Sequence, residues 1–472
     1  MRRLTGMRLT GMGLRSTGFR GTGFRGSWFR DRGRLARAIG ATAIMSGVAG
    51  AALGVPTAAQ ASWTPIKTLT GATWEGVDPA ISANAKGALI TAWEGINNAD
   101  PTCGNQIQIR LRSSAGKWGR IRQLTPCGPW NIFPAVAYNA TGYGVVAWLR
   151  TSDNAIQAVT VSPAGKIGPV RTVTPKNNQA YFPMVAVSPA GQALVVWQTV
   201  RATTTGPNGI LARFISPRSA LGRVRSLGAS TQMVSAPVFD KTGTATVAYT
   251  ATKVYAVRLT PKGVGKSAVI LSPAIGTSYG KPQLADDSNG NTFVLAQLNV
   301  TTKTSQKEHL VVRKWSKVRA LGKAITVGTA ASTVTVTNIA DGPALAADGA
   351  GDAVVVWNSA LSSSRAAVYG RRLSHTGSLG RTVRLGTGYL PHIGIAPAGL
   401  GLITWQSTPF QSGRVTTIYG RHVTATKGTF GSLFKFTTDG AYAQLAVDKA
   451  GKSGVIWERS SLGSIIQARF GS

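Results

Sequence analysis

The sequence predicts an all-β fold, an eight-bladed β-propeller, and three observations support this. A unit of about fifty residues recurs eight times, the last unit lacks one strand, and a segment near the start of the chain can supply that strand. Each unit has a glycine, and in seven of the eight units an aromatic residue follows six positions later. The glycines are Gly87, Gly142, Gly191, Gly243, Gly290, Gly351, Gly399 and Gly451, and the later residues are Trp93, Trp148, Trp197, Tyr249, Ala296, Trp357, Trp405 and Trp457.

Each unit predicts a blade of four short antiparallel strands. In the sixth unit, PALAA at 343–347 and DAVVVW at 352–357 are apolar runs, as expected for strands covered on both faces. The D-x-x-G sequence between them is typical of a hairpin turn. VYGRRL at 368–373 supplies the third strand and GRTVRLG at 380–386 the fourth, whose basic residues would discourage edge-to-edge association.

The ring is predicted to close through the start of the mature chain. The last unit supplies three strands before the sequence ends at Ser472. Residues 65–70, PIKTLT, match residues 169–174, PVRTVT, which form a fourth strand elsewhere. Such four-stranded sheets bury both faces only when they stack radially and the ring closes. We therefore expect the N-terminal strand to complete the eighth blade.

These units resemble those of secreted bacterial β-propeller repeat proteins over residues 62–472, and they loosely resemble NHL repeats. They lack the S-x-D-x-G-x-x-W box of sialidase-like propellers. The eight-bladed quinoprotein dehydrogenases carry T-G-K-x-x-W, with Trp four residues after Gly, whereas here the aromatic residue comes six after. The resemblance implies the fold and export, and it names no ligand.

Residues 1–61 are predicted to be a secretory signal segment with a low-complexity basic beginning. Arginines continue to Arg37, an apolar run spans Ala38–Val55, and Ala59-Gln60-Ala61 fits a cleavage site. The long basic tract has two interpretations, an extended signal or a start site assigned too early. No later stretch approaches the roughly 20 apolar residues of a membrane span. The expectation is a monomeric protein, 62–472, that is secreted and extracellular or associated with the cell wall.

Charge and cysteine content suggest partners and compartment. The first 61 residues hold ten Arg and one Asp, so the rest keeps a net charge of +27 out of +36. Such a charge favours anionic cell-surface polymers, acidic glycans or proteins. Specific nucleic-acid binding is not expected, because Arg is spread evenly over the blades. In an oxidising compartment the two cysteines, Cys103 and Cys127, predict one disulfide on the face that carries the variable loops.

Candidate ligand-binding residues occur at two repeated positions on that face. The residue after the aromatic anchor is polar in six units: Glu94, Gln198, Gln297, Asn358, Gln406 and Glu458. Aromatic residues precede or open the innermost strand: Trp74, Trp130, Phe133, Tyr181, Phe182, Tyr279, Tyr389 and Tyr442. Both sets suit a polysaccharide, and both have a structural alternative, satisfying loop backbone groups and packing between blades. Arginine recurs on the third strand at Arg110, Arg213, Arg313, Arg371, Arg421 and Arg469, either as a structural partner of the aromatic anchor by cation–π contact or as an anion-binding ring.

The leading functional hypothesis is a non-catalytic binding or scaffold protein. No catalytic, cofactor or metal-binding motif is recognisable, and the four histidines lack ligand spacing. The alternative is a carbohydrate-active enzyme, a glycoside hydrolase or lyase, that uses Glu94, Glu458 or Asp78, because paired carboxylates perform glycoside hydrolysis.

Overall fold

The computed structural model describes residues 62–100, 102–176, 178–199, 209–229, 234–272, 277–301, 306–318, 320–331, 342–362, 365–409, 415–459 and 464–471. These residues form strands, turns and loops, without a helix. None of them forms a helix long and apolar enough to cross a membrane. The predicted signal segment, 1–61, lies outside the described residues and stays a prediction.

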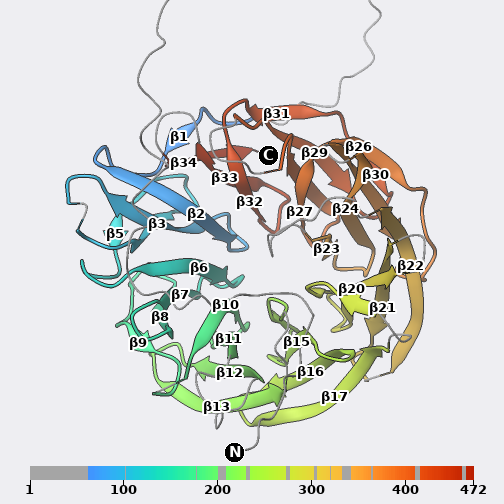
Figure 1. Ribbon diagram of the computed structural model, residues 1–472, viewed down its shortest axis with the longest axis horizontal. Helices are drawn as coiled ribbons and strands as arrows, with labels where there is room; N and C mark the ends of the chain where they lie inside the picture. Colours follow the sequence, from blue (N-terminus) through green and yellow to red (C-terminus); the bar gives the residue numbers. More distant parts are fainter. Residues whose placement is uncertain are drawn as a thin grey trace, which may run out of the picture. The chain divides into compact units, whose positions relative to one another are not determined.

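Eight antiparallel sheets surround a common axis, which confirms the predicted eight-bladed β-propeller (Figure 1). From the axis outward, the first four blades are β2(Trp74–Ala83), β3(Leu89–Asn97), β4(Gln106–Arg112), β5(Arg122–Gln123); β6(Asn131–Tyr138), β7(Gly144–Arg150), β8(Ala155–Val161), β9(Arg171–Thr172); β10(Ala180–Val187), β11(Ala193–Thr199), β12(Gly209–Ile215), β13(Leu221–Gly228); and β14(Val238–Phe239), β15(Ala245–Thr250), β16(Val254–Thr260), β17(Gly263–Leu271).

Two of the last four blades divide one strand, and the eighth takes its outer strand from the N-terminus. The innermost strand of blade 5 and the outermost strand of blade 7 are each split in two. The strands are β18(Thr277–Tyr279) and β19(Gln283–Asp286), β20(Thr292–Thr301), β21(Gln306–Trp315), β22(Leu321–Ala331); β23(Ala344–Ala347), β24(Ala353–Ser362), β25(Arg365–Leu373), β26(Val383–Thr387); β27(Tyr389–Ile395), β28(Leu400–Gln406), β29(Ile418–Thr424), β30(Thr429–Phe430) and β31(Phe434–Thr437); and β32(Ala441–Val447), β33(Ser453–Arg459), β34(Ile465–Gly471), β1(Lys67–Thr68).

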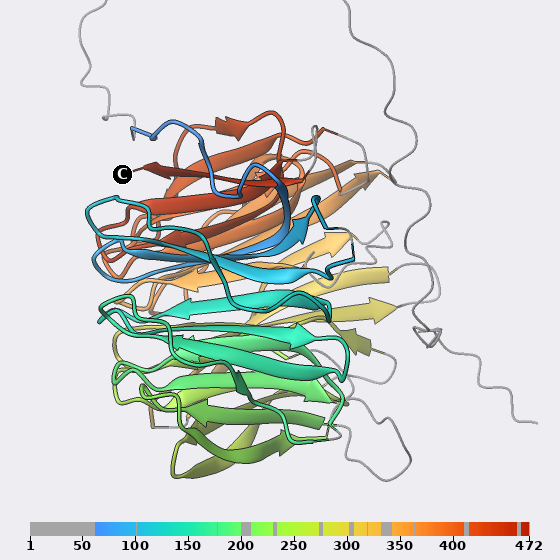
Figure 2. The same ribbon diagram turned by 90° about the vertical axis from the view of Figure 1, so that its left-hand side faces the viewer.

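The hairpin between the first two strands of a blade has the predicted turn chemistry. In blade 1, Oδ1 of Asn84 accepts hydrogen bonds from the backbone N–H groups of Lys86 and Ala88, both at 2.9 Å. Gly87 follows with φ of 77°, in the left-handed region that glycine adopts at little cost. Asp448 repeats the arrangement in blade 8. These turns fix the register of the two inner strands and leave the other end of the blade for longer loops. We call that end, which carries 98–100, 102–105 and 124–130, the loop face (Figure 2).

The aromatic anchors fill the space between neighbouring sheets. The side chains of Trp93, Trp148, Trp197 and Trp457 are fully buried. Trp197 packs with Leu149 and Ile156 of the preceding blade. Burying a large aromatic side chain stabilises the fold by up to a few kcal/mol, so each anchor couples two blades. Blade 5 has Ala296 at this position, and the buried Trp315 enters the same core cluster from the end of β21.

The recurring arginine of the third strand joins adjacent blades by hydrogen bonds. In blade 3, Nε of Arg213 donates to the backbone oxygen of Gly222 at 2.7 Å, and Nη1 donates to that of Val173, in blade 2, at 2.8 Å. Arg313 and Arg371 make the same two contacts in blades 5 and 6. The cation–π pairs in the described residues place no arginine of this set over its own anchor, and Arg110 lies over Trp118 instead. This arginine is therefore a structural clamp between blades.

The N-terminal strand closes the ring as predicted. Lys67 and Thr68 pair with Ala468 and Gln467 of β34, antiparallel. Trp63 packs edge-on against Phe436 of blade 7, with ring centroids 4.6 Å apart. Leu69 is fully buried, and its backbone N–H donates to the oxygen of Ile466 at 2.7 Å.

Candidate functional site

A non-glycine residue with positive φ recurs on the innermost strand, directly before the position of the recurring proline. These residues are Asp78, Phe133, Phe182, Leu390 and Tyr442, with φ between 49° and 57°. The pairing with the second strand shifts register at each of them. A left-handed non-glycine residue costs about 1–2 kcal/mol, so the surroundings must hold it there. We call this set, together with Lys281 at the corresponding position of blade 5, the axial ring.

The residue after the anchor provides part of this support. Oε1 of Glu94 accepts a hydrogen bond from the backbone N–H of Phe133, in the next blade, at 2.8 Å. Gln406 does the same for Tyr442 at 3.1 Å, and Glu458 accepts from the backbone N–H of Asp78. Three of the six predicted polar residues thus connect their own blade to the strained innermost strand of the next blade. Gln198, Gln297 and Asn358 are half-buried at the same position, and ligand binding by all six stays a prediction.

The structure brings together the three carboxyl groups of the enzyme alternative, where blades 8, 1 and 2 meet. Burial raises the pKa of Glu94 well above its usual range, and the neighbouring charge of Asp78 raises it further. The two side chains share a hydrogen bond, which favours the protonated form of Glu94 and the charged form of Asp78. Burial, together with the charges of Asp78 and Glu75, raises the pKa of Glu458 to about 7, although a hydrogen bond from Ser464 opposes the shift.

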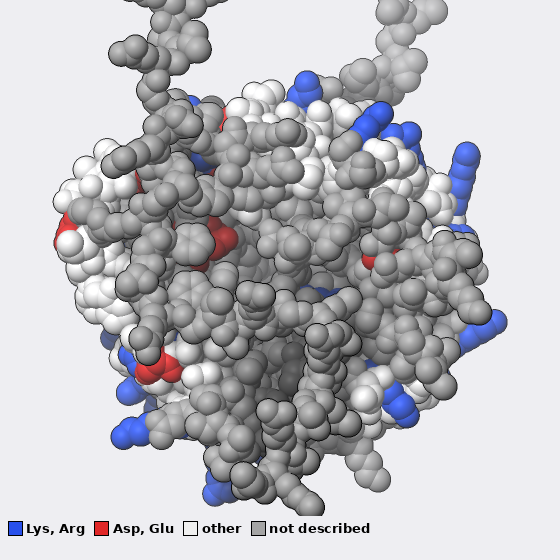
Figure 3. All heavy atoms as spheres, in the orientation of Figure 1, with Lys and Arg blue, Asp and Glu red and all other residues white. Residues whose placement is uncertain are grey.

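Asp78 is the member of this cluster that a ligand can reach. The side chains of Glu94 and Glu458 are only 2% and 6% exposed, while Asp78 is exposed to solvent. Protein still surrounds Asp78 on most sides, and this partial burial raises its pKa. In Figure 3 acidic atoms lie near the inner end of blade 1, beside the centre of the ring.

Aromatic side chains of the axial ring lie next to these carboxyl groups. Phe133 and Phe182, from blades 2 and 3, are in contact with ring centroids 5.2 Å apart, and Phe133 is 39% exposed. Tyr181 continues this group, 6.4 Å from Phe182. Trp130 is 53% exposed and precedes β6. The result is an apolar, partly solvated surface bordered by Asp78.

The other predicted aromatic residues divide into three cases. Trp74 is half-buried at the start of β2. Tyr389 is 4% exposed and belongs to a small core cluster against which Tyr442 packs, and ligand binding by it stays a prediction. The side chain of Tyr279 lies outside the described residues, although its backbone pairs with Leu298.

A basic group faces the centre of the ring from the opposite side. Nζ of Lys281, in blade 5, lies 3.8 Å from Sδ of Met184 in blade 3. Burial lowers the pKa of Lys281 to about 8. Burial and the charge of Lys281 lower the pKa of His392, in blade 7, to about 4. These residues come from alternate blades, so their proximity places them near the axis. Lys281 and His392 are not among the residues predicted from the sequence, although Lys281 precedes a recurring proline as Asp78 and Phe133 do.

The two cysteines form the predicted disulfide on the loop face. Cys103, in the loop after β3, is bonded to Cys127, in the connection to blade 2, with their Cα atoms 4.9 Å apart. A disulfide is compatible with an oxidising compartment, and export itself stays a prediction. Within the described residues, these cysteines and Asp100 are the one group of metal-ligating side chains whose ligand atoms all lie within 4.8 Å of one another, and a disulfide leaves no thiolate to bind a metal.

Comparison with known proteins gives structural matches alone. No protein-family model and no curated protein matches the chain. One similar structure is a protein of unknown function from Dyadobacter fermentans, with 12% identity, a TM-score of 0.39 and coverage of 87% of this chain and all of that one.

Two other similar structures are enzymes that act on carbohydrates. An ulvan lyase bound to -[GlcA(1-4)Rha3S]- has 8% identity and a TM-score of 0.44, with 85% and 95% of the chains covered. An α-L-arabinofuranosidase from Fusarium graminearum, in complex with an iminosugar inhibitor, has 11% identity and a TM-score of 0.40, with 75% and 94% covered. Likeness this distant supports no inference about activity. The sheets and their closure themselves identify the chain as an eight-bladed β-propeller.

Proposed function

We propose that the protein is a non-catalytic glycan-binding propeller whose binding site is the axial ring. The observation that carries this proposal is the contact between Phe133 and Phe182, two partly exposed aromatic residues held in left-handed backbone beside the exposed Asp78. Aromatic faces pack against the apolar face of a sugar ring, and a carboxylate accepts hydrogen bonds from its hydroxyl groups. Small-molecule sites combine these two features.

The electrostatics of the axial ring suit a ligand with both hydroxyl and acidic groups. Asp78 lies on one side, and Lys281 and His392 lie on the other. In Figure 3 basic atoms lie near the centre of the ring, toward blade 5. Lys281 retains a positive charge at neutral pH and would bind a carboxylate or sulfate group of the glycan. An acidic glycan also agrees with the net charge of the whole chain.

Catalysis is the second candidate, and the proton shared by Asp78 and Glu94 favours it. Two coupled carboxyl groups can serve as acid and base. Against this function, Glu94 and Glu458 are buried and each accepts a hydrogen bond from a strained backbone group of the next blade. Truncation of either side chain to alanine would remove this hydrogen bond and disturb the axial ring itself, so Asp78 is the informative position.

The test is a glycan array run with wild type and the variants Phe182→Ala and Asp78→Asn. The control is Leu400→Ala, which removes an exposed apolar side chain on the turn side of blade 7. We expect both axial variants to lose at least tenfold in affinity for the glycans that wild type binds at high salt, and the control to bind normally. High salt suppresses the non-specific attraction of a strongly basic protein. Unchanged binding by both axial variants would refute the proposal.

Turnover of the bound glycans separates the two candidates. Reducing ends or unsaturated products released by wild type, and not by Asp78→Asn, would identify an enzyme. We expect no turnover by either protein.

A further inference from the structure

The anchor tryptophans bury an indole N–H group that needs an acceptor. Trp93, Trp148 and Trp457 donate to a glutamine directly opposite on the third strand, Gln108, Gln157 and Gln467, at 3.0, 3.2 and 3.1 Å. Trp197 donates to Oδ1 of Asn178 at 3.3 Å, and Trp405 to the backbone oxygen of Thr387 at 3.2 Å. Five of the six anchors thus follow the rule that buried polar groups are hydrogen-bonded.

Trp357 of blade 6 is the exception among the anchors that the structure describes. Its side chain is 3% exposed, and its Nε1 has no hydrogen-bond partner among the residues that the structure describes. The residue opposite is Tyr369, which stacks on the indole with ring centroids 5.8 Å apart. Blade 7 has the same Trp–Tyr pair in Trp405 and Tyr419, yet there the N–H reaches a backbone acceptor. Leaving such a donor unpaired in a buried position is unfavourable, so an acceptor from outside would stabilise it.

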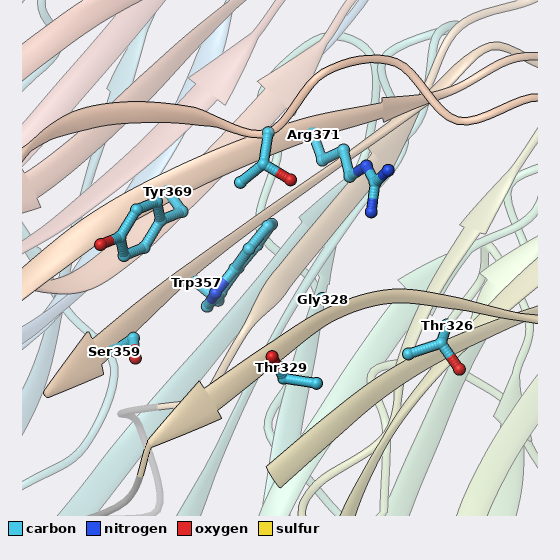
Figure 4. Close-up of a pocket in the computed structure, with 8 residues that line it drawn as sticks. Thr326, Gly328, Thr329, Trp357, Ser359, Tyr369 and Arg371 are labelled. Carbon is cyan, nitrogen blue, oxygen red and sulfur yellow. The ribbon is translucent and has the colours of Figure 1, made fainter. Parts of the chain in front are cut away.

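A cavity of about 350 Å³ lies at this position, between blades 5 and 6. It is lined by Thr326 and Thr329 of β22 and by Trp357, Ser359 and Tyr369 of blade 6. Figure 4 shows the nitrogen edge of Trp357 directed toward the space between Ser359 and Thr329. The cavity is at the lower end of the range for small-molecule sites.

The chemistry of the lining selects the ligand. Thr326, Thr329, Ser359 and Tyr369 carry hydroxyl groups, which both donate and accept hydrogen bonds. The described residues that line the cavity include no carboxylate, and their one cation, Arg371, already donates to the backbone oxygens of Gly380 and Val327. Such a site suits a small neutral molecule with several hydroxyl groups.

We propose that the cavity between blades 5 and 6 is a second, independent site that binds a single neutral sugar unit, one oxygen of which accepts the hydrogen bond from Nε1 of Trp357. The ligand completes a pairing that the protein makes internally in the other five tryptophan blades. The site is separate from the axial ring, which consists of residues of the innermost strands, and it does not depend on the function proposed for that ring.

The repeat itself provides the test. Tyr369→Gln places opposite Trp357 the residue that caps the anchor in blades 1, 2 and 8, so it supplies the missing acceptor from within. The matched control is Tyr419→Gln in blade 7, where the N–H of Trp405 is already bonded. D-glucose, D-galactose and N-acetyl-D-glucosamine are titrated separately into ¹⁵N-labelled full-length protein, and the indole N–H resonance of Trp357 is followed.

We expect at least one of these sugars to shift the Trp357 resonance saturably, with binding at least tenfold weaker in Tyr369→Gln and unchanged in Tyr419→Gln. The capped variant should also melt at a higher temperature than wild type in the absence of sugar. Should Tyr369→Gln fail to fold, Trp357→Phe, which lacks the donor, is titrated by calorimetry and should show the same tenfold loss.

Three results would overturn the proposal. The first is that none of the three sugars shifts the Trp357 resonance saturably, which would mean that water alone fills the cavity. The second is that Tyr369→Gln binds the sugar as tightly as wild type. The third is that Trp357→Phe binds it as tightly as wild type. Phe182→Ala should leave the Trp357 titration unchanged. A glycan array that shows no binding at the axial ring therefore leaves the Trp357 titration unaffected. A negative Trp357 titration likewise leaves the glycan-array result unaffected.

Discussion

At the scale of single residues, the polar side chain after each anchor is best understood through the backbone that it supports. Glu94, Gln406 and Glu458 accept hydrogen bonds from the backbone of the next blade, so a carboxylate and a carboxamide perform the same structural task. They differ in the cost of burial, since a carboxamide carries no charge. Gln406 shows that an amide is sufficient to accept this hydrogen bond, whereas blade 8 has an acid, Glu458, at the same position.

This difference predicts how Glu458→Gln changes stability with pH. Because burial raises the pKa of Glu458 to about 7 in the folded protein, the unfolded chain releases this proton first as pH rises from about 4.5. The wild-type free energy of unfolding thus falls between about pH 4.5 and pH 7, by about 3 kcal/mol in total. The Gln variant lacks this loss. We expect equal stability near pH 4.5 and a more stable variant at pH 8, measured by urea unfolding.

The reverse substitution in blade 7 is the control. Gln406→Glu places an acid in an equally buried position, so its stability relative to wild type should fall as pH rises over the same interval. A Glu458→Gln variant that is equally or less stable than wild type at both pH values would contradict the explanation.

The backbone conformation of the axial ring could not be predicted from the sequence. A residue before proline normally favours the β or polyproline region, so left-handed backbone at Asp78 and Phe133 could not be expected from local preference. At both residues the preceding blade supplies an acceptor for the backbone N–H. The aromatic candidates were predictable from their repeated position. Lys281 and His392 were not, because only the closed ring brings blades 3, 5 and 7 together at the axis.

At the scale of elements, the strands and turns could be predicted from the sequence because each repeat has the same local pattern of residues. The apolar runs became inner strands and the Asx-Gly turns closed the hairpins. The arginine of the third strand was recognised as a repeated feature, but its partners are backbone oxygens of two blades. Because every residue has a backbone oxygen, the sequence does not indicate which ones accept these hydrogen bonds, and the clamp could be found only in the structure.

The clamp predicts a measurable coupling between blades. Arg213→Met keeps the aliphatic stem and removes the donors to Gly222 and Val173. Two backbone oxygens then lose their charged partner, at a cost of about 1–3 kcal/mol. The control is Arg223→Met on the outer strand β13, where the side chain is exposed and a change within about 0.5 kcal/mol is expected. Equal unfolding midpoints for the two variants in urea would show that the clamp contributes nothing.

At the scale of the whole molecule, closure joins the eight blades into one continuous ring. Every blade covers a face of the next, and β1 joins the first part of the chain to the last strand, β34. The closing segment also connects three blades. Trp63 packs on Phe436 of blade 7, and the backbone oxygen of Leu69 accepts a hydrogen bond from Arg110 of blade 1 at 3.4 Å. This long-range pairing was predictable because the match between 65–70 and 169–174 survives in the sequence.

Removal of residues 62–72 should therefore weaken the entire ring. The truncated protein loses the partner of β34, exposes an unpaired strand edge and uncovers the apolar surface beneath Trp63 and Leu69. We expect a lower, broader thermal transition and concentration-dependent aggregation, followed by calorimetry and light scattering. Full-length variants test the same segment without truncation. Leu69→Ala, at a fully buried position, should cost about 2–5 kcal/mol. Ile66→Ala, at a position 45% exposed three residues earlier, should change stability by less than about 1 kcal/mol. A truncated protein that melts like the full chain and stays monodisperse would show that β1 is dispensable for closure.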